Sequence, residues 1–176
     1  MTTPTKLLHG VALTATGLLA GAFGYGAANV VPTFNAVPLD VRLTFHTAMM
    51  EINEPVMQTA MALAILSTFG LAIAGRGRVR WLAGGAGALA LASLLITVFG
   101  NVPLHALIRQ WAAATSAPTG HAEILQRWET FHTLRTLTGL AAFILIVAIG
   151  VVGLGKPESR RPLRPGREAQ RLSFPS

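Results

Sequence analysis

Four long apolar runs alternate with shorter polar segments along the chain. They cover residues 7–31, 56–74, 81–99 and 134–154, and each is close to the length of about 20 residues that a helix needs to cross a bilayer core. No run contains Asp, Glu or Lys near its middle. The strict alternation of apolar and polar positions that is typical of membrane β-barrels is also missing. The pattern therefore predicts an all-α polytopic membrane protein.

Small residues are placed where the predicted helices would meet. The first run carries Gly, Thr and Ala at spacings of three and four, from Gly10 to Ala28, and the third and fourth runs carry shorter stripes of the same kind. Helices in lipid associate through small residues because these let the backbones approach closely. With short connections between antiparallel neighbours, the four runs predict an up-down four-helix transmembrane bundle.

The two longer connections have helical patterns of their own. Residues 38–50 carry apolar side chains at helical spacing, which predicts a short helix on the outer membrane interface. Asn53 is then expected to cap the second span. Residues 101–111 are expected to form a second short interfacial helix, capped by Asn101. From residue 121 the helical pattern continues to about 153, so the fourth helix should be longer than its span.

The composition agrees with a membrane location. Hydrophobic residues make up 52% of the chain and charged residues only 12%, whereas soluble domains carry about 25% charged residues. The mean hydropathy is +0.53. Cys is absent, which excludes disulfide chemistry, a thiolate nucleophile, an iron–sulfur cluster and a Cys-ligated zinc site.

Basic residues are distributed unevenly between the two sides of the predicted bundle. The formal net charge is +7, and ten of the 14 Lys and Arg residues lie before the first span, between the second and third, or after the fourth. Because cytoplasmic loops are enriched in Lys and Arg, we expect an integral protein of the bacterial inner membrane with both termini in the cytoplasm. The same rule explains the positive charge without a nucleic-acid partner. The transmembrane domain should cover residues 1–155, followed by a basic, Pro-rich, disordered cytoplasmic tail over 156–176.

Polar side chains capable of acid–base or ligand chemistry gather at the outer end of the predicted bundle. They come from the ends of all four spans: Tyr25, Asn29, His46, Glu51, Asn53, Asn101, His105, Trp128, His132 and Arg135. Trp128, His132 and Arg135 follow one another at spacings of four and three, which places them on one helix face. Since ionisable residues at a membrane boundary tend to face the bundle interior or a water-filled cavity, the sequence predicts a pocket there.

Three of these side chains are histidines from different segments. His46, His105 and His132 are expected to hold one transition metal, with Glu51 completing the site, because imidazole is a ligand for copper and iron. No close-spaced ligand motif such as H-E-x-x-H accompanies them. A site without a metal, in which the same residues form a structural hydrogen-bond network, is the competing interpretation.

Four segments resemble a known family. Residues 101–111, which read NVPLH and end in Trp, resemble the N-x-P-[LI]-N…W element of the DUF1772, or anthrone-oxygenase-like, membrane proteins. Residues 127–136, RWETFHTLRT, resemble the W-x-x-[WF]-[NH]-x-x-R-[TS] element of the same family. The end of the first run, residues 21–32, and residues 50–53 are similar to the two remaining signatures. The resemblance covers about residues 7–153.

The resemblance implies a four-helix membrane protein. Characterised relatives are small oxygenases of polyketide pathways, which oxidise an anthrone to an anthraquinone with O₂ and without a flavin or haem. The sequence departs from the family at His105, where the family commonly has Asn, and His46 and Glu51 are additional features. This enrichment in potential ligands favours a metal and argues against the anthrone itself as the substrate.

The sequence therefore predicts an O₂-dependent oxidoreductase that acts on a small apolar, phenolic or polyketide-like substrate. His132 or His105 is expected to be the general base, because imidazole titrates near neutral pH. Arg135, with Asn101, is expected to stabilise the developing enolate or phenolate oxygen. The residues expected to contact the substrate are Tyr25, Asn29, Asn53, Trp111 and Trp128. The alternative is a non-catalytic small-molecule binder or complex subunit, and a homodimer is compatible with either.

Overall fold

The computed structural model describes residues 3–154, and nearly all of them are helical. The elements are α1 (Thr3–Tyr25), η1 (Gly26–Val30), α2 (Val31–Ala36), α3 (Leu39–Ala74), α4 (Arg78–Ile96), η2 (Thr97–Asn101), α5 (Val102–Ala114) and α6 (His121–Leu154). Two of these, η1 and η2, are single π-helical turns, and the others are α-helices. No strand occurs within residues 3–154. The predicted all-α fold is confirmed.

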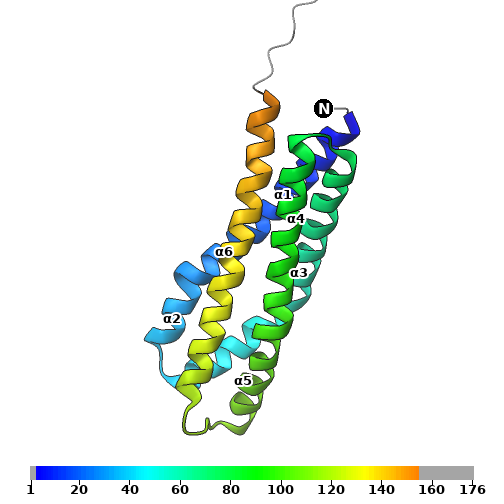
Figure 1. Cartoon of the computed structure of the whole chain (residues 1–176). Helices are drawn as coiled ribbons and strands as arrows, with labels where there is room; N and C mark the ends of the chain where they lie inside the picture. The colour runs from blue at the N-terminus through cyan, green and yellow to red at the C-terminus, as the bar shows by residue number, and fades with distance from the viewer. Residues whose placement is uncertain (1–2, 155–176) are drawn as a thin grey trace, which may run out of the picture.

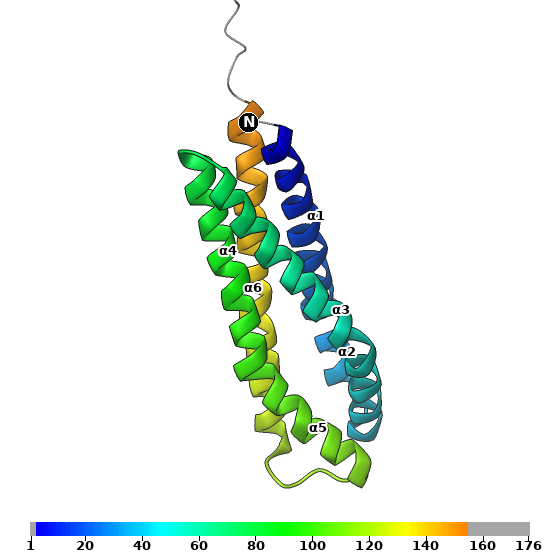
Figure 2. The ribbon, with the colours of Figure 1, turned by 90° about the vertical axis from the view of Figure 1, so that its right-hand side faces the viewer.

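Four long helical segments form an up-down bundle (Figure 1). The first consists of α1, η1 and α2, the second of α3, the third of α4, η2 and α5, and the fourth of α6. All four are long and apolar enough to span a membrane. The N-terminus, the α3–α4 turn and the end of α6 lie at one end, opposite α2 and α5 (Figures 1 and 2). We call residues 3–20, 62–92 and 137–154 the terminal half, and residues 21–61 and 93–136 the distal half.

The helices are longer than the apolar runs that predicted them. α3 has 36 residues, which corresponds to about 54 Å, whereas the hydrocarbon core of a bilayer is about 30 Å thick. The separate helix predicted over residues 38–50 and the cap predicted at Asn53 are wrong, because α3 continues through both. Pro55 lies inside this helix and removes one of its hydrogen bonds. Burial of Leu43 and Met50 in the distal core stabilises the part of α3 that precedes the proline.

α5 continues from α4 through η2, so it is not the separate interfacial helix that the sequence predicted. Pro103 lies in its first turn as expected. Asn101 precedes the helix but makes no capping hydrogen bond, because its backbone is helical and its side chain donates to the carbonyl of Trp128 in α6. The uninterrupted helix predicted from residue 121 is confirmed as α6. The tail predicted over residues 156–176 lies outside the described residues.

Small residues fill much of the core of the terminal half. Its buried cluster consists of Ala12, Leu71, Ala83, Ala86, Ala142, Ile146 and Ile149. The glycine stripe predicted along α1 contributes less to this packing. A Cβ at Gly17 would lie 3.1 Å from the Phe143 ring, whereas one at Gly10, Gly21 or Gly24 would meet no other described atom within 4 Å. Alanines of the core and a glycine of α4, Gly87, whose added Cβ would lie 2.9 Å from the Phe69 ring, therefore let these helices approach each other.

Candidate functional site

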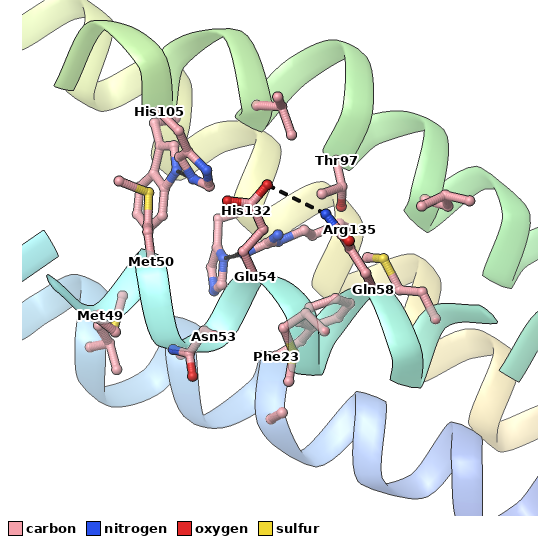
Figure 3. Close-up of a pocket in the computed structure, with 18 of the residues that line it drawn as sticks. Phe23, Met49, Met50, Asn53, Glu54, Gln58, Thr97, His105, His132 and Arg135 are labelled. Atoms are coloured by element: carbon pink, nitrogen blue, oxygen red, sulfur yellow. Dashed lines mark hydrogen bonds between the residues drawn. The ribbon is translucent and has the colours of Figure 1, made fainter. Parts of the chain in front are cut away.

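A cavity of about 360 Å³ lies in the distal half, bordered by all four helical segments. Its wall is mainly apolar and includes four methionines of α3: Met49, Met50, Met57 and Met61. The polar residues of the wall are Tyr25, Asn53, Glu54, Gln58, Thr97, His105, His132 and Arg135. Figure 3 shows that α3 supplies Glu54 and Gln58, whereas His132 and Arg135 come from another helix, α6. A mainly apolar cavity with a few fixed polar groups has the usual form of a small-molecule site.

Arg135 and His132, one turn apart on α6, form the best-fixed polar pair of this wall. Nε and Nη2 of Arg135 lie 3.2 and 2.7 Å from Nδ1 of His132. Because a guanidinium can only donate, Nδ1 accepts, and the proton of the imidazole is on Nε2. The guanidinium also lies over the Phe23 ring, 4.7 Å from its centroid. Arg135 is only 9% exposed, and among the described residues no carboxylate lies within ion-pair distance of it.

Trp128 connects the two histidines that line the cavity. Its indole N–H donates to Nε2 of His105 over 2.6 Å, and its ring stacks on His132 with a centroid distance of 5.3 Å. Since an indole cannot accept, Nε2 of His105 is the acceptor and the proton of that ring is on Nδ1. Both imidazoles therefore have a defined tautomer, and the acceptor nitrogen of each is already occupied.

His46 is buried behind the wall of the cavity and is not part of it. Its ring stacks on Phe34 with a centroid distance of 4.6 Å and meets the Trp128 ring edge-on at 4.3 Å. Its centroid is 5.9 Å from that of His105. Neither nitrogen of His46 has a hydrogen-bond partner in the part of the chain that the structure describes. The contacts of His46 are therefore those of an aromatic packing residue that supports Trp128.

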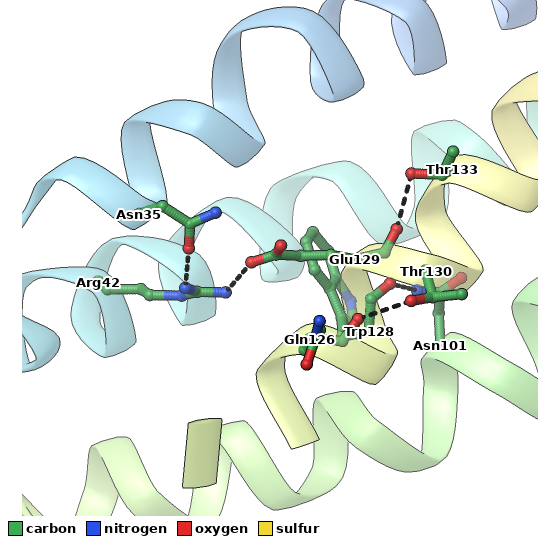
Figure 4. A network of polar contacts seen from close by, with 8 residues as sticks. All are labelled: Asn35, Arg42, Asn101, Gln126, Trp128, Glu129, Thr130 and Thr133. Carbon is green, nitrogen blue, oxygen red and sulfur yellow. Dashed lines mark hydrogen bonds and ion pairs between the residues drawn. The ribbon is translucent and has the colours of Figure 1, made fainter. Parts of the chain in front are cut away.

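A second group of polar contacts ties the distal helices together outside the cavity. Arg42 of α3 donates to Oδ1 of Asn35 in α2 over 2.5 Å and to Oε1 of Glu129 in α6 over 2.9 Å (Figure 4). The side chains of Arg42 and Glu129 are 7% and 22% exposed. Asn101, which is fully buried, donates to the backbone carbonyl of Trp128. These bonds fix the start of α6, and with it the residues that face the cavity.

The structure brings some of the predicted site residues to the cavity and leaves others outside it. Those in the wall are Tyr25, Asn53, His105, Trp128, His132 and Arg135. Asn29 is exposed on η1, and Trp111 packs against the distal core. Asn101 is buried and bonded to α6, so its side chain does not reach the wall. The predicted substrate contacts of Asn29 and Trp111, and the predicted catalytic role of Asn101, therefore have no support in this geometry.

The predicted metal ligands do not form a coordination site. Within residues 3–154, no group of three His, Asp or Glu side chains is arranged to hold a metal ion. The acceptor nitrogens of His105 and His132 take hydrogen bonds from Trp128 and Arg135, and Glu51 is exposed and outside the cavity wall. The donor set therefore does not fit the copper or iron centre that the sequence predicted.

The sequence prediction includes Asn53 but omits most of the α3 face that lines the cavity. The residues of this face recur at helical spacing: Met50, Glu54, Met57, Gln58 and Met61. Glu54, Met57, Gln58 and Met61 show this spacing in the part of α3 that follows Asn53, and Met50 joins them only if the helix continues through Pro55. A helix that begins at a cap on Asn53 therefore separates only Met50 from this face.

Both π-helical turns border the cavity, and each has a glycine that faces an aromatic ring of α6. A Cβ on Gly26 in η1 would lie 2.9 Å from the ring of His132, and one on Gly100 in η2 would lie 2.6 Å from the ring of Phe131. Real Cβ contacts are longer, so any larger residue would force the ring to move. π turns inside α-helices occur frequently at functional sites. Here they allow two helical segments to approach adjacent rings of a third.

Comparison with known proteins identifies one family. A sequence model of the anthrone oxygenase family matches residues 45–145. The matched range contains His105, His132 and Arg135 of the cavity wall. No curated protein and no solved structure matches the chain. Because the family match covers more than half of the chain, the protein belongs to the anthrone oxygenase family.

Proposed function

We propose that this protein is a membrane-embedded oxygenase that uses O₂ to oxidise a small, apolar, phenolic substrate of the polyketide type in the distal cavity. One observation carries the proposal. Arg135 is buried in the wall of an apolar cavity, in a helix long enough to span a membrane, without a carboxylate partner among the described residues. A buried charge without a counter-ion is costly. A substrate that becomes anionic during the reaction would supply the missing negative charge.

The guanidinium of Arg135 is oriented to bind such an anion. His132 accepts from Nε and Nη2, and the Phe23 ring supports the guanidinium plane, while Nη1 has no hydrogen-bond partner within residues 3–154. A donor fixed in advance in an apolar site stabilises developing charge strongly, because the surroundings need not reorganise. In this proposal Arg135 binds the enolate or phenolate oxygen, and His132 positions Arg135.

The proposed reaction converts a methylene group between two aromatic rings into a carbonyl group, as the name of the matched family suggests. Loss of one C–H proton gives an electron-rich enolate that reacts with O₂. One oxygen atom remains on the carbon, and the other leaves as water with the two former methylene hydrogens. The electrons that the carbon loses reduce O₂, so each substrate consumes one O₂ and yields one carbonyl product and one water.

An apolar substrate can reach the cavity from the lipid. Tyr25, Val98 and Val102 line the cavity and are also exposed on the outside of the bundle, where they would contact lipid. We further propose a bacterial inner-membrane location with both termini in the cytoplasm, since the basic turn at residues 76–80 lies at the same end as the N-terminus (Figure 1). The cavity would then lie in the outer half of the bilayer.

The test of this function is turnover by the full-length protein in lipid nanodiscs, with anthrone as the probe substrate. O₂ uptake and quinone absorbance are followed together, and the wild-type protein should consume one O₂ for each quinone formed. R135Q should lower turnover by about 100-fold or more, because one oxyanion donor contributes about 10² to 10³ in kcat. R127Q is the matched control: Arg127 is exposed on the same helix, outside the cavity wall, and its loss should change turnover by less than about twofold.

Three results would contradict parts of this proposal. A wild-type protein that binds apolar phenols but oxidises neither anthrone nor a panel of them would be a binder or a complex subunit. Equal turnover by R135Q and R127Q, both shown to be folded by thermal unfolding, would remove the role of Arg135. Turnover that follows the copper or iron content of the samples and disappears on chelation would transfer the chemistry from the side chains to a metal.

A further inference from the structure

We infer that Glu54 is the base that removes the substrate proton, and this inference rests on the oxygenase function proposed above. Glu54 is half-buried on α3 and is the only carboxylate among the described residues of the cavity wall. Figure 3 shows its side chain at the cavity, beside Gln58 and on the same helix as Met50 and Asn53. The assignment replaces the histidines that the sequence predicts as bases.

The two histidines of the wall are occupied as acceptors. Arg135 donates to Nδ1 of His132, and Trp128 donates to Nε2 of His105. The remaining nitrogen of each ring carries a proton and can only donate. Either ring would have to lose a hydrogen bond of 2.7 or 2.6 Å before it could accept a proton. A proton on His132 would also place a second positive charge directly against the guanidinium of Arg135.

The other polar groups of the wall do not accept protons at neutral pH, since they are a phenol, two amides and a hydroxyl: Tyr25, Asn53, Gln58 and Thr97. His46 has unpartnered nitrogens within the described structure, but it lies behind the wall, where Phe34 and Trp128 pack against its ring. Elimination therefore leaves Glu54.

Two neighbours contact Glu54 weakly and leave most of its capacity to accept hydrogen bonds unused. Nε2 of Gln58, one turn further along α3, donates to Oε1 over 3.4 Å. Nη1 of Arg109 in α5 lies 3.8 Å from Oε2, and both side chains of this ion pair are 40% exposed. Both contacts are long, and exposed ion pairs are weak. Each carboxylate oxygen therefore keeps a lone pair for a substrate proton.

The inferred step moves negative charge from one side of the cavity to the other. A C–H bond of the substrate methylene breaks, its proton forms an O–H bond with Glu54, and the electron pair stays on the substrate as an enolate. The charge thus passes from Glu54 on α3 to the substrate oxygen at Arg135 on α6. Glu54 returns the proton when the second oxygen atom of O₂ leaves as water.

The experiment measures proton abstraction separately from oxidation. Full-length protein in nanodiscs is incubated with anthrone in D₂O without oxygen, and loss of the methylene proton signal is followed by NMR above the protein-free rate. The same samples then receive O₂, and quinone formation is recorded. E54Q keeps the side-chain size and should lower both rates by about 100-fold or more, because general-base catalysis contributes about 10² to 10⁴. E54D keeps a carboxylate and should retain more of both rates than E54Q.

Two matched variants separate a base from a structural residue. R109Q breaks the ion pair with Glu54 but keeps the carboxylate, and E123Q makes the same substitution at an exposed glutamate outside the cavity. Both should stay within about threefold of the wild-type rates. A loss in R109Q equal to that in E54Q would overturn the assignment in favour of a structural ion pair.

The two proposals fail in different ways. Wild-type rates of exchange and oxidation in E54Q would overturn the role of Glu54 and leave the oxygenase function intact. Exchange that requires Glu54, in a wild-type protein that forms no quinone, would support the base and contradict the oxygenase. A wild-type protein that does not accelerate exchange at all would overturn the role of Glu54. If E54Q does not fold, the comparison of E54D with R109Q decides the question.

Discussion

The two halves of the bundle satisfy their buried polar groups in different ways. In the terminal half the hydroxyls of Thr16 and Thr68 donate to carbonyls one turn earlier in their own helix, over 2.7 and 2.6 Å. In the distal half the bonds run between helices, as from Arg42 to Glu129 and from Asn101 to the Trp128 carbonyl. Thr16 and Thr68 are therefore satisfied within their own helices, and His9 of α1, 3.0 Å from the Ile146 carbonyl of α6, adds a contact between terminal helices. The charged and amide contacts of the distal half exist only when several helices are in place.

The two halves also differ in the side chains that fill their cores. Alanines and a few aliphatic side chains fill the terminal core, and the helices lie close together there. The distal half contains large rings, charged groups and both π turns, and it encloses the cavity. The comparison indicates that the closely packed terminal half stabilises the bundle. This stability allows the distal half to contain polar groups that are incompletely packed.

The largest effect on stability is expected where the distal half depends on a buried ion pair. E129Q removes the negative charge opposite Arg42 and leaves the buried guanidinium with neutral partners, which should destabilise the protein by about 3 kcal/mol. SDS-induced unfolding followed by circular dichroism measures the change. The double variant R42M/E129L should recover at least half of the loss, because apolar replacements of buried pairs are often neutral. An E129Q protein as stable as the wild type would show that interhelical bonds do not hold the distal half together.

A smaller effect, on activity more than on stability, is expected at the π turn next to His132. G26A places a Cβ 2.9 Å from that ring and should lower oxygenase turnover between about tenfold and 100-fold, because the ring moves and Arg135 moves with it. G24A is the matched control, since a Cβ there meets no described atom within 4 Å. Turnover assays and thermal unfolding are run on both. Equal activity in G26A and G24A would mean that the position of His132 does not matter.

The smallest effect on stability and turnover is expected from a substitution in the terminal half. T68V removes a buried hydroxyl whose only described hydrogen bonds are within its own helix, so unfolding free energy should change by less than about 1 kcal/mol and turnover should not change. The same SDS titration and turnover assay measure both quantities. A loss above about 2 kcal/mol would erase the contrast between the halves.

The sequence predicts the terminal half well and the distal half in part. Apolar runs locate the helices because lipid dictates their length and composition. The gathering of His105, His132 and Arg135 at one end also follows, because all three lie near the ends of runs. The contacts of these side chains cannot be predicted from the sequence. No local pattern tells whether Asn101 faces a substrate or the Trp128 carbonyl. Nor does any pattern tell whether the imidazole acceptors face a metal or protein donors. These contacts depend on how each helix is rotated about its axis, which the π turns and tertiary packing set.

The π turns also link the shape of the cavity to the insertion or deletion of a single residue. A π turn contains one residue more than a regular turn, and each residue of an α-helix corresponds to a rotation of about 100°. An in-frame deletion of one codon within residues 26–30 or 97–101 would restore a regular helix. Because the wider π turn absorbs the extra residue and with it this rotation, the segments beyond it would keep nearly the same orientation, and only the widened turn beside the cavity would be lost. A one-codon insertion is accordingly the smallest mutation that would introduce such a turn into a regular transmembrane helix. Single-residue gaps at these two places would distinguish homologues that have the cavity from homologues that do not.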